Sequence, residues 1–139
     1  AMSRYALLPY WYTVFYEAEQ TGMPVMRMMW MQYPKTEELF ALDDQYMVGS
    51  DLLVKPVTAE GVTQVILLFP TDHLWYDVVS MKLASSKVAP SKVSRKTVGA
   101  DSDTIPVYQR GGSVIPRRLR LPIHNDDERR SIYAVRCVG

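Results

Sequence analysis

Short apolar runs with turn residues between them follow one another from residue 45 onward, and this rhythm constrains the fold more than any other feature. The first four runs are QYMVG, LLVKPV, VTQVILLF and HLWYDVV, and GSD, TAEG and PTD separate them. Strands that recur roughly every eight to twelve residues with turn signals between them are typical of an antiparallel sandwich. Three further runs complete the pattern: IPVYQ, SVIP and SIYAVRCV. The sequence therefore predicts a mainly β fold, an antiparallel β-sandwich.

Residues 84–103, ASSKVAPSKVSRKTVGADSD, interrupt this rhythm. The segment is rich in Ser, Lys and Val, has no apolar period, and carries several basic residues before its first acidic one. An arm that binds nucleic acid would need aromatic residues among the charges, and this segment has none. We interpret it as a mobile, solvated insert.

The N-terminal segment predicts a helix over residues 3–22, because apolar residues recur there at the spacing of one helix face. Ser3 is the expected N-cap and Gly22 the expected end, and Pro9 either kinks the helix or marks its true start. Aromatic residues at this spacing mostly fill a core, so we expect a helix packed on two sides; a sugar-stacking platform is the alternative. The expected apolar face consists of Leu8, Trp11, Tyr12, Phe15 and Ala18.

Residues 24–34, PVMRMMWMQYP, are a nearly continuous apolar run between two prolines. Such a run suits a strand covered on both faces, as in a parallel sheet, and we expect this strand over residues 24–33. The following KTEELFALDD favours a short helical turn. A helix followed by a buried strand is one unit of an α/β protein, and a single unit cannot close a parallel sheet. We therefore expect the chain to be a fragment of a larger protein.

Composition narrows the class of protein. With 47% hydrophobic and 22% charged residues, the 139-residue chain is expected to be globular, with room for one ordinary domain. A net charge of +1 is too small to favour nucleic acid or an anionic membrane as a partner. Neither a membrane-spanning run nor a signal peptide is expected. Cys137 is the only cysteine, which excludes an internal disulfide and a cysteine-based zinc site.

Three aspartates, Asp43, Asp44 and Asp51, surround a strand-like run and raise the question of paired catalytic carboxylates. A glycosidase holds its two carboxyl groups on opposite sides of the scissile bond, roughly 5 to 9.5 Å apart, which sequence neighbours in a turn cannot do. The three also lack the ligand spacing of a calcium loop. We interpret them as solvated turn residues.

The remaining polar motifs do not assemble a site by spacing alone. His73 and His124 are the only histidines, and they lie far apart in sequence. The RGG of residues 110–112 lacks the helix and lysine of a phosphate-binding loop, so we expect Gly111 and Gly112 to serve a tight turn or bulge. No metal site and no cofactor are expected.

Several longer motifs resemble glycoside hydrolase family 31. They are RYALLPYWYTVFYEAEQTGMPVMR, DDQYMVGSDLLVKPV, WYD at residues 75–77 and IPVYQRGGSVIPRR at residues 105–118, in that order. The resemblance covers nearly the whole chain apart from residues 84–103. It implies that residues 1–42 are the end of a catalytic (β/α)8 barrel and that residues 43–139 are a C-terminal β-sandwich carrying the insert.

The resemblance also implies a function for the parent protein. Members of this family are retaining α-glucosidases that use two aspartates to hydrolyse terminal α-linked glucose. The spelling of several motifs is similar to that of the branch that trims N-linked glycans in the endoplasmic reticulum lumen with a non-catalytic β-subunit. The family's catalytic residues lie upstream of the matched region, so no catalytic residue is expected here, and no substrate-binding residue can be assigned. The isolated segment is expected to be structural, inactive and prone to self-association.

A free-standing β-sandwich module that binds carbohydrate or protein is the alternative of another class. An exposed coplanar row of aromatic rings, such as Tyr76 with Trp75 or Tyr108, would favour it.

Overall fold

The computed structural model describes residues 5–85, 91–100 and 105–118, together with the backbone of residues 133–137. In this part of the chain β-strands predominate, and every strand pairing is antiparallel. The expectation of a mainly β, antiparallel fold is confirmed. No helix in these ranges is long and apolar enough to span a membrane.

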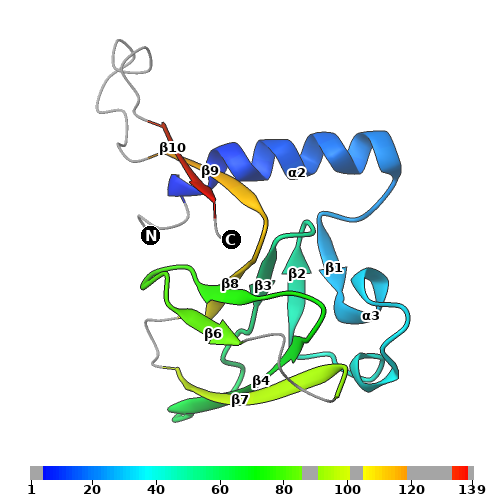
Figure 1. Ribbon diagram of the computed structural model, residues 1–139, viewed down its shortest axis with the longest axis vertical. Helices are drawn as coiled ribbons and strands as arrows, with labels where there is room; N and C mark the ends of the chain where they lie inside the picture. Colours follow the sequence, from blue (N-terminus) through cyan, green and yellow to red (C-terminus); the bar gives the residue numbers. More distant parts are fainter. Residues whose placement is uncertain (1–4, 86–90, 101–104, 119–132, 138–139) are drawn as a thin grey trace.

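One six-stranded sheet organises the molecule (Figure 1). Its strands lie in the order β1 (Met26–Met28), β2 (Tyr46–Val48), β3 (Leu52–Val54), β8 (Val107–Arg110), β5 (Trp75–Asp77) and β6 (Leu83–Ser85). Two strand pairs accompany it: β4 (Gln64–Pro70) with β7 (Val93–Gly99), and β9 (Val114–Arg118) with β10 (Tyr133–Cys137). The helical elements are α2 (Leu8–Thr21), α3 (Met29–Gln32) and the 3-10 turn η1 (Glu37–Leu39), which confirms the expected short helical turn.

The two faces of the six-stranded sheet bury separate cores, because side chains alternate along each strand. The face that carries Met47, Leu53 and Tyr108, which are neighbours in register, packs on the β4–β7 pair. We call this the first core; its buried members are Met29, Tyr33, Leu39, Met47, Leu53, Leu67, Phe69, Trp75, Val93 and Tyr108. The opposite face packs on α2 and β9. We call this the second core; its buried members are Tyr10, Val14, Val48, Leu52, Val54, Val78 and Ile115.

The buried side-chain amide of Gln45, which precedes β2, connects the six-stranded sheet to β4. Gln45 is fully buried; its Nε2 donates to the Leu68 carbonyl oxygen at 2.7 Å, and its Oε1 accepts from the Leu68 amide at 3.1 Å. The side chain therefore satisfies both backbone groups of one residue, as a paired strand would.

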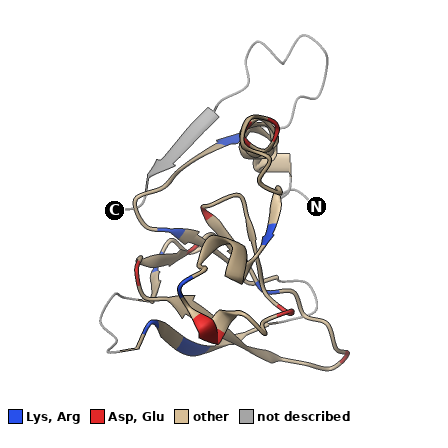
Figure 2. Ribbon diagram, turned by 90° about the vertical axis from the view of Figure 1, so that its right-hand side faces the viewer, with Lys and Arg blue, Asp and Glu red and all other residues tan. Residues whose placement is uncertain are grey.

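A proline near its start and a glycine at its end limit helix α2. Pro9 lies in the first turn of α2; residues 5–6 before it are also helical, and a turn at Leu7 interrupts the helix there. Gly22 ends it in the left-handed conformation, with φ of 72°. The expected N-cap Ser3 lies outside the described residues. Viewed nearly along its axis, α2 lies on one side of the strands, and basic and acidic residues are spread over several elements (Figure 2).

The expected buried face of α2 is wrong. Only Tyr10 and Val14 are buried, whereas Tyr12 and Phe15 are 76% and 59% exposed. Apolar residues recur every three or four positions on more than one side of α2, so the spacing does not identify the buried side. The sheet covers the side that contains Tyr10 and Val14. The helix is thus packed on one side, not two.

The expected strand over residues 24–33, covered on both faces, is also wrong. Strand β1 has three residues, pairs antiparallel with β2, and exposes Met26 and Met28 while burying Arg27. The chain then turns into α3, whose Met29 is fully buried in the first core. The apolar run therefore forms two short elements, a strand and a helix. Hydrophobic periodicity alone cannot distinguish this arrangement from a single buried strand.

The interpretation of residues 84–103 as a loop is wrong for its centre. Residues Val93–Gly99 form β7, which pairs with β4 along seven positions. Val93 is buried. The two lysines of this strand region are exposed, and each donates a hydrogen bond to a backbone carbonyl: Lys92 Nζ to Lys35 at 3.0 Å and Lys96 Nζ to Ala84 at 2.7 Å. Residues 86–90 and 101–104 lie outside the described ranges, and mobility of the insert stays a prediction.

Candidate functional site

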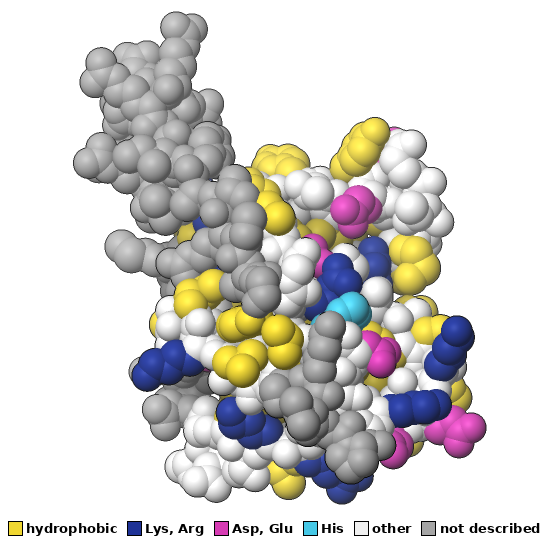
Figure 3. Space-filling view, in the orientation of Figure 1, with side chains coloured by type: hydrophobic (Ala, Val, Ile, Leu, Met, Phe, Trp, Pro, Cys, Tyr) yellow, Lys and Arg dark blue, Asp and Glu magenta, His cyan; other side chains and the backbone are white. Residues whose placement is uncertain are grey.

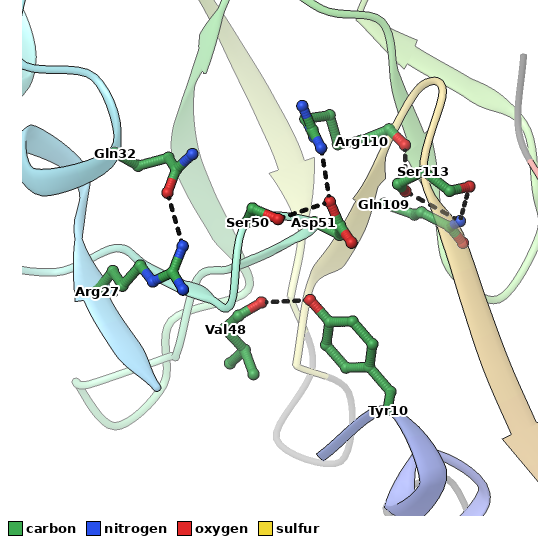
Figure 4. Close-up of polar contacts among 9 residues, drawn as sticks. All are labelled: Tyr10, Arg27, Gln32, Val48, Ser50, Asp51, Gln109, Arg110 and Ser113. Atoms are coloured by element: carbon green, nitrogen blue, oxygen red, sulfur yellow. Dashed lines mark hydrogen bonds and ion pairs between the residues drawn. The ribbon is translucent and has the colours of Figure 1, made fainter. Parts of the chain in front are cut away.

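Polar side chains gather at one end of the six-stranded sheet, between α2 and α3. Figure 3 shows basic, acidic and histidine side chains on this face, below α2. In Figure 4 the charged and amide side chains of this region come from β1, from α3, from the β2–β3 turn and from the end of β8. We call the set of Arg27, Gln32, Ser50, Asp51 and Arg110 the junction cluster.

Asp51 is held by an ion pair at the centre of this cluster. Its Oδ1 accepts from Arg110 Nη2 at 2.8 Å and from Ser50 Oγ at 3.0 Å. The Arg110 amide also donates to the Asp51 carbonyl at 2.8 Å, so backbone and side chain tie the same two residues together. Asp51 thus locks the β2–β3 turn to β8.

Arg27, on β1, is also buried, with 6% of its surface exposed. Its Nε donates to the Pro24 carbonyl at 2.9 Å, and its Nη1 donates to Gln32 Oε1 at 3.0 Å (Figure 4). Both acceptors are neutral. The Arg27 side chain therefore links β1 to α3, but neither acceptor neutralises its positive charge.

Gly49 lets α2 approach the sheet. It has φ of 60°, and an added Cβ would lie 2.6 Å from Tyr10 Oη and 2.9 Å from Val14 Cγ2. Tyr10 Oη donates to the Val48 carbonyl at 2.8 Å across this contact (Figure 4). Burial, and next the charge of Asp51, raise the pKa of Tyr10 well above its usual value, so the phenol stays protonated.

Tyr33 lies under the same face. Its Oη is buried without a hydrogen-bond partner, and burial raises the pKa of Tyr33 well above its usual value, while Arg110 opposes the shift. The ring of His73, which the sequence does not assign to a site, lies 6.4 Å from the Tyr33 ring. His124 and the Cys137 side chain fall outside the described part.

The RGG segment is a turn, as expected. Gly112 has φ of 79°, and a Cβ on Gly111 would lie 2.9 Å from Leu74 Cβ, so one glycine supplies conformation and the other supplies space. Ser113 Oγ donates to the Arg110 carbonyl at 2.6 Å across the turn.

The interpretation of all three aspartates as solvated is wrong for Asp51, whose side chain is 17% exposed and pairs with Arg110. Asp44 pairs with Lys55, whose side chain is only 6% exposed, but the Asp44 side chain is itself 46% exposed. Asp43 is exposed, as expected. A lone cation inside an apolar run, as in LLVKPV, is the sequence signal for the pair of Lys55 with Asp44, because buried Lys and Arg are rare unless paired.

The carboxylates are not arranged for glycosidic cleavage. Asp44 precedes β2 and Asp51 follows it, so at about 3.3 Å per residue they lie roughly 15 Å apart, beyond the separation of a catalytic pair. Among the described residues, no three His, Cys, Asp or Glu side chains come together as a metal site would require. The absence of catalytic residues from this chain stays a prediction.

The aromatic row that would favour a free-standing binding module is not present. Trp75 is fully buried, and Tyr108 is 5% exposed. Trp75 Nε1 donates to the Pro70 carbonyl at 3.0 Å, and the Phe69 and Tyr108 rings meet edge to face at 4.9 Å. These rings are core. An open groove of about 230 Å³ lies elsewhere, between Trp30, Pro34 and Phe40.

Comparison with known proteins gives consistent matches. The profile of the glycosyl hydrolase family 31 C-terminal domain matches residues 22–115. Neutral alpha-glucosidase AB of Dictyostelium discoideum is 41% identical over 138 residues, which are 97% of this chain and 13% of that protein. The chain therefore spans about an eighth of the curated relative's length.

Two solved structures are also similar. One is the endoplasmic-reticulum glucosidase II heterodimer, a catalytic subunit with the binding domain of a regulatory subunit; it matches with a TM-score of 0.75 and 35% identity, over 84% of this chain and 12% of that one. The other is the α-xylosidase of Xanthomonas citri, with a TM-score of 0.82 and 26% identity, over 98% of this chain and 14% of that one.

Proposed function

Because the chain belongs to glycosyl hydrolase family 31, we propose that it is the C-terminal portion of an α-glucosidase that hydrolyses terminal α-linked glucose by a retaining mechanism. The match of residues 22–115 to the family's C-terminal domain carries the proposal, and the 41% identity to a neutral alpha-glucosidase supports the choice of glucose. The two catalytic carboxylates belong to the parent polypeptide outside these residues, since Asp44 and Asp51 are committed to Lys55 and Arg110.

The segment itself supports the catalytic domain. In this proposal residues 1–42 end the barrel and residues 43–139 form the sandwich, and the pairing of β1 with β2 joins the two parts. The outer face of α2 is the contact with the rest of the barrel. Its exposed aromatic residues support this, since a large exposed apolar patch on a folded protein marks an interface; they are Tyr12, Phe15 and Tyr16.

Turnover by the full-length parent tests the function. We expect the parent to cleave an aryl α-glucoside and the 139-residue chain to release nothing, because the chain lacks the carboxylate pair. An aryl α-xyloside is the matched control for substrate, since a similar structure is an α-xylosidase. A parent that prefers the xyloside, or cleaves neither substrate, would contradict the proposal.

The cellular role we propose is trimming of N-linked glycans in the endoplasmic reticulum lumen, together with a non-catalytic subunit. Similarity to the glucosidase II heterodimer supports this. Release of glucose from a glucosylated N-glycan by the parent, and co-purification of a second subunit, are the expected results. A parent that acts only on free glucans would contradict the role but not the reaction.

Exposure of the α2 face predicts that the isolated chain self-associates. Each large apolar side chain left in water forgoes about 1.5 to 3 kcal/mol of burial. Sedimentation of the wild-type chain at rising concentration should show dimers or larger species, and the variant Tyr12→Ser/Phe15→Ser should stay monomeric. A monomeric wild type at all concentrations would contradict the assignment of this face as a contact.

A further inference from the structure

Arg27 is a buried cation without a buried anion. Its guanidinium has five N–H donors, and the neutral acceptors Pro24 and Gln32 take two of them. Among the described residues, neither ion pair involves Arg27. Buried charges in proteins are ordinarily paired, because taking an unpaired charge out of water costs several kcal/mol.

The neighbouring carboxylate does not fill this gap. Arg27 is level with Met47 in the sheet register, and Arg110 is two residues beyond Tyr108, which places both arginines on the first-core face. Asp51 is already bound by Arg110 and Ser50. Within the junction cluster two guanidinium charges face one carboxylate (2 − 1 = +1), and Asp72, which also acts on Tyr33, is in neither ion pair of the described residues.

Two more donors on the same face lack an acceptor. Tyr33 Oη and Arg110 Nε are buried, and neither has a hydrogen-bond partner. Buried polar groups are nearly always satisfied in complete structures. Donors without acceptors, combined with an excess positive charge, call for an acceptor-only anionic group, and a carboxylate is the protein side chain of that kind.

From this juxtaposition we infer that the junction cluster is a docking site for one Asp or Glu side chain of the parent polypeptide, outside residues 1–139, with Arg27 as its main partner. This rests on the proposed function, in which the chain is part of a longer enzyme; it spans 13% of a curated relative. The carboxylate would bind the end of the barrel at β1, the strand with which β2 of the sandwich is paired. This polar contact would add a defined geometry to the apolar contact of α2, because a planar guanidinium binds a carboxylate through two parallel hydrogen bonds.

Carboxylate labelling of the full-length parent identifies the occupant. The protein is treated with a carbodiimide and glycine ethyl ester, and labelled Asp and Glu residues are mapped by mass spectrometry. We expect Arg27→Met to raise the labelling of one upstream carboxylate several-fold, Arg27→Lys to raise it less, and Arg95→Met, at an exposed position on β7, to change nothing. Unchanged upstream labelling in Arg27→Met overturns the inference.

Melting temperatures supply a second readout. In the parent, Arg27→Met should lower the melting temperature by several degrees, because it strands a buried carboxylate. In the 139-residue chain the same variant should leave it unchanged or raise it, because it removes an uncompensated cation. An equal loss in both, or a loss in the parent only when a second subunit is added, overturns the inference. Turnover of the α-glucoside by the wild-type parent is measured separately, so failure of the proposed function is recognised independently.

Discussion

The two cores on opposite faces of the six-stranded sheet are closed in different ways. The first core is closed by the chain's own β4–β7 pair and is rich in large rings, among them Phe69, Trp75 and Tyr108. The second core is mostly aliphatic, and α2 contributes only Tyr10 and Val14 to its buried residues. Among the described residues, the outer side of α2 is exposed, with Tyr12 at 76% and Phe15 at 59%. In our proposal the first core makes this segment a folding unit, and the outer side of α2, beyond the second core, contacts the rest of the parent.

Truncation of a side chain in each core is the strongest test of this contrast. Phe69→Ala should cost about 3 to 5 kcal/mol of unfolding free energy, because the ring is fully enclosed. Val14→Ala should cost about 2 kcal/mol, from two methyl groups. Urea denaturation of the 139-residue chain measures both. If Val14→Ala cost as much as Phe69→Ala, the second core would be as important to folding as the first.

Gly49→Ala probes the approach of α2 to the sheet. We expect a loss of about 2 to 3 kcal/mol, because a side chain here is strained by positive φ and also meets Tyr10 and Val14. Gly61→Ala is the matched control: its φ of 75° is similar, but nothing lies within 4 Å of its Cβ. It should cost about 1 kcal/mol, from strain alone. Equal losses for the two variants would mean that the helix does not press on Gly49.

The aspartates at the two ends of the β2–β3 hairpin should affect stability but not chemistry. Asp44→Asn leaves Lys55 buried without its anion and should cost about 1 to 3 kcal/mol; Asp51→Asn should cost about 1 to 2 kcal/mol. Asp43→Asn, at an exposed position, should cost almost nothing. In the parent, all three should keep most of the α-glucoside turnover. Loss of turnover by orders of magnitude at an unchanged melting temperature would show that the altered aspartate reaches the sugar.

Two buried tyrosines give the smallest effect at neutral pH and a distinct effect in alkali. Tyr10→Phe should cost about 1 kcal/mol, because it removes the bond to Val48, whereas Tyr33→Phe should cost nothing in the isolated chain. Burial raises the pKa of both phenols above the ordinary 10.0. Folded tyrosine therefore holds its proton after unfolded tyrosine has lost it, so stability is intact below pH 10 and falls as pH rises above about 10.

Melting curves between about pH 8 and 11 check this dependence. Each Phe variant should flatten the alkaline fall in melting temperature, because it removes one of the groups that titrate. A fall of the same steepness in the double variant Tyr10→Phe/Tyr33→Phe would assign the alkaline transition to other groups.

The antiparallel β character and the limits of α2 were accessible from local patterns. Short apolar runs between turn residues predict strands without reference to their partners, and Pro9 and Gly22 restrict the backbone wherever they occur. The RGG turn belongs to the same class, because positive φ at Gly112 is a local requirement. Family membership could also be inferred from the sequence, since it depends on which motifs occur and on their order along the chain.

Tertiary contacts decided the rest. Strand β7 has only Val93 buried, and its hydrogen bonds to β4, not an apolar period, make it a strand. Helix α2 has apolar residues on more than one side, and the position of the sheet selects Tyr10 and Val14 as the buried ones. The ion pair of Asp44 with Lys55 joins residues brought close by the β2–β3 hairpin, and that of Asp51 with Arg110 joins residues brought close by the pairing of β3 with β8.

The sequence by itself therefore determined where the backbone can turn, which segments can be extended and which family the chain resembles, because these depend on residue type and order along the chain. Only the tertiary structure decided which side of each element is buried and which charges are paired. The physical reason is that burial and ion pairing depend on what lies opposite in space, as the pairs of Asp44 with Lys55 and of Asp51 with Arg110 show.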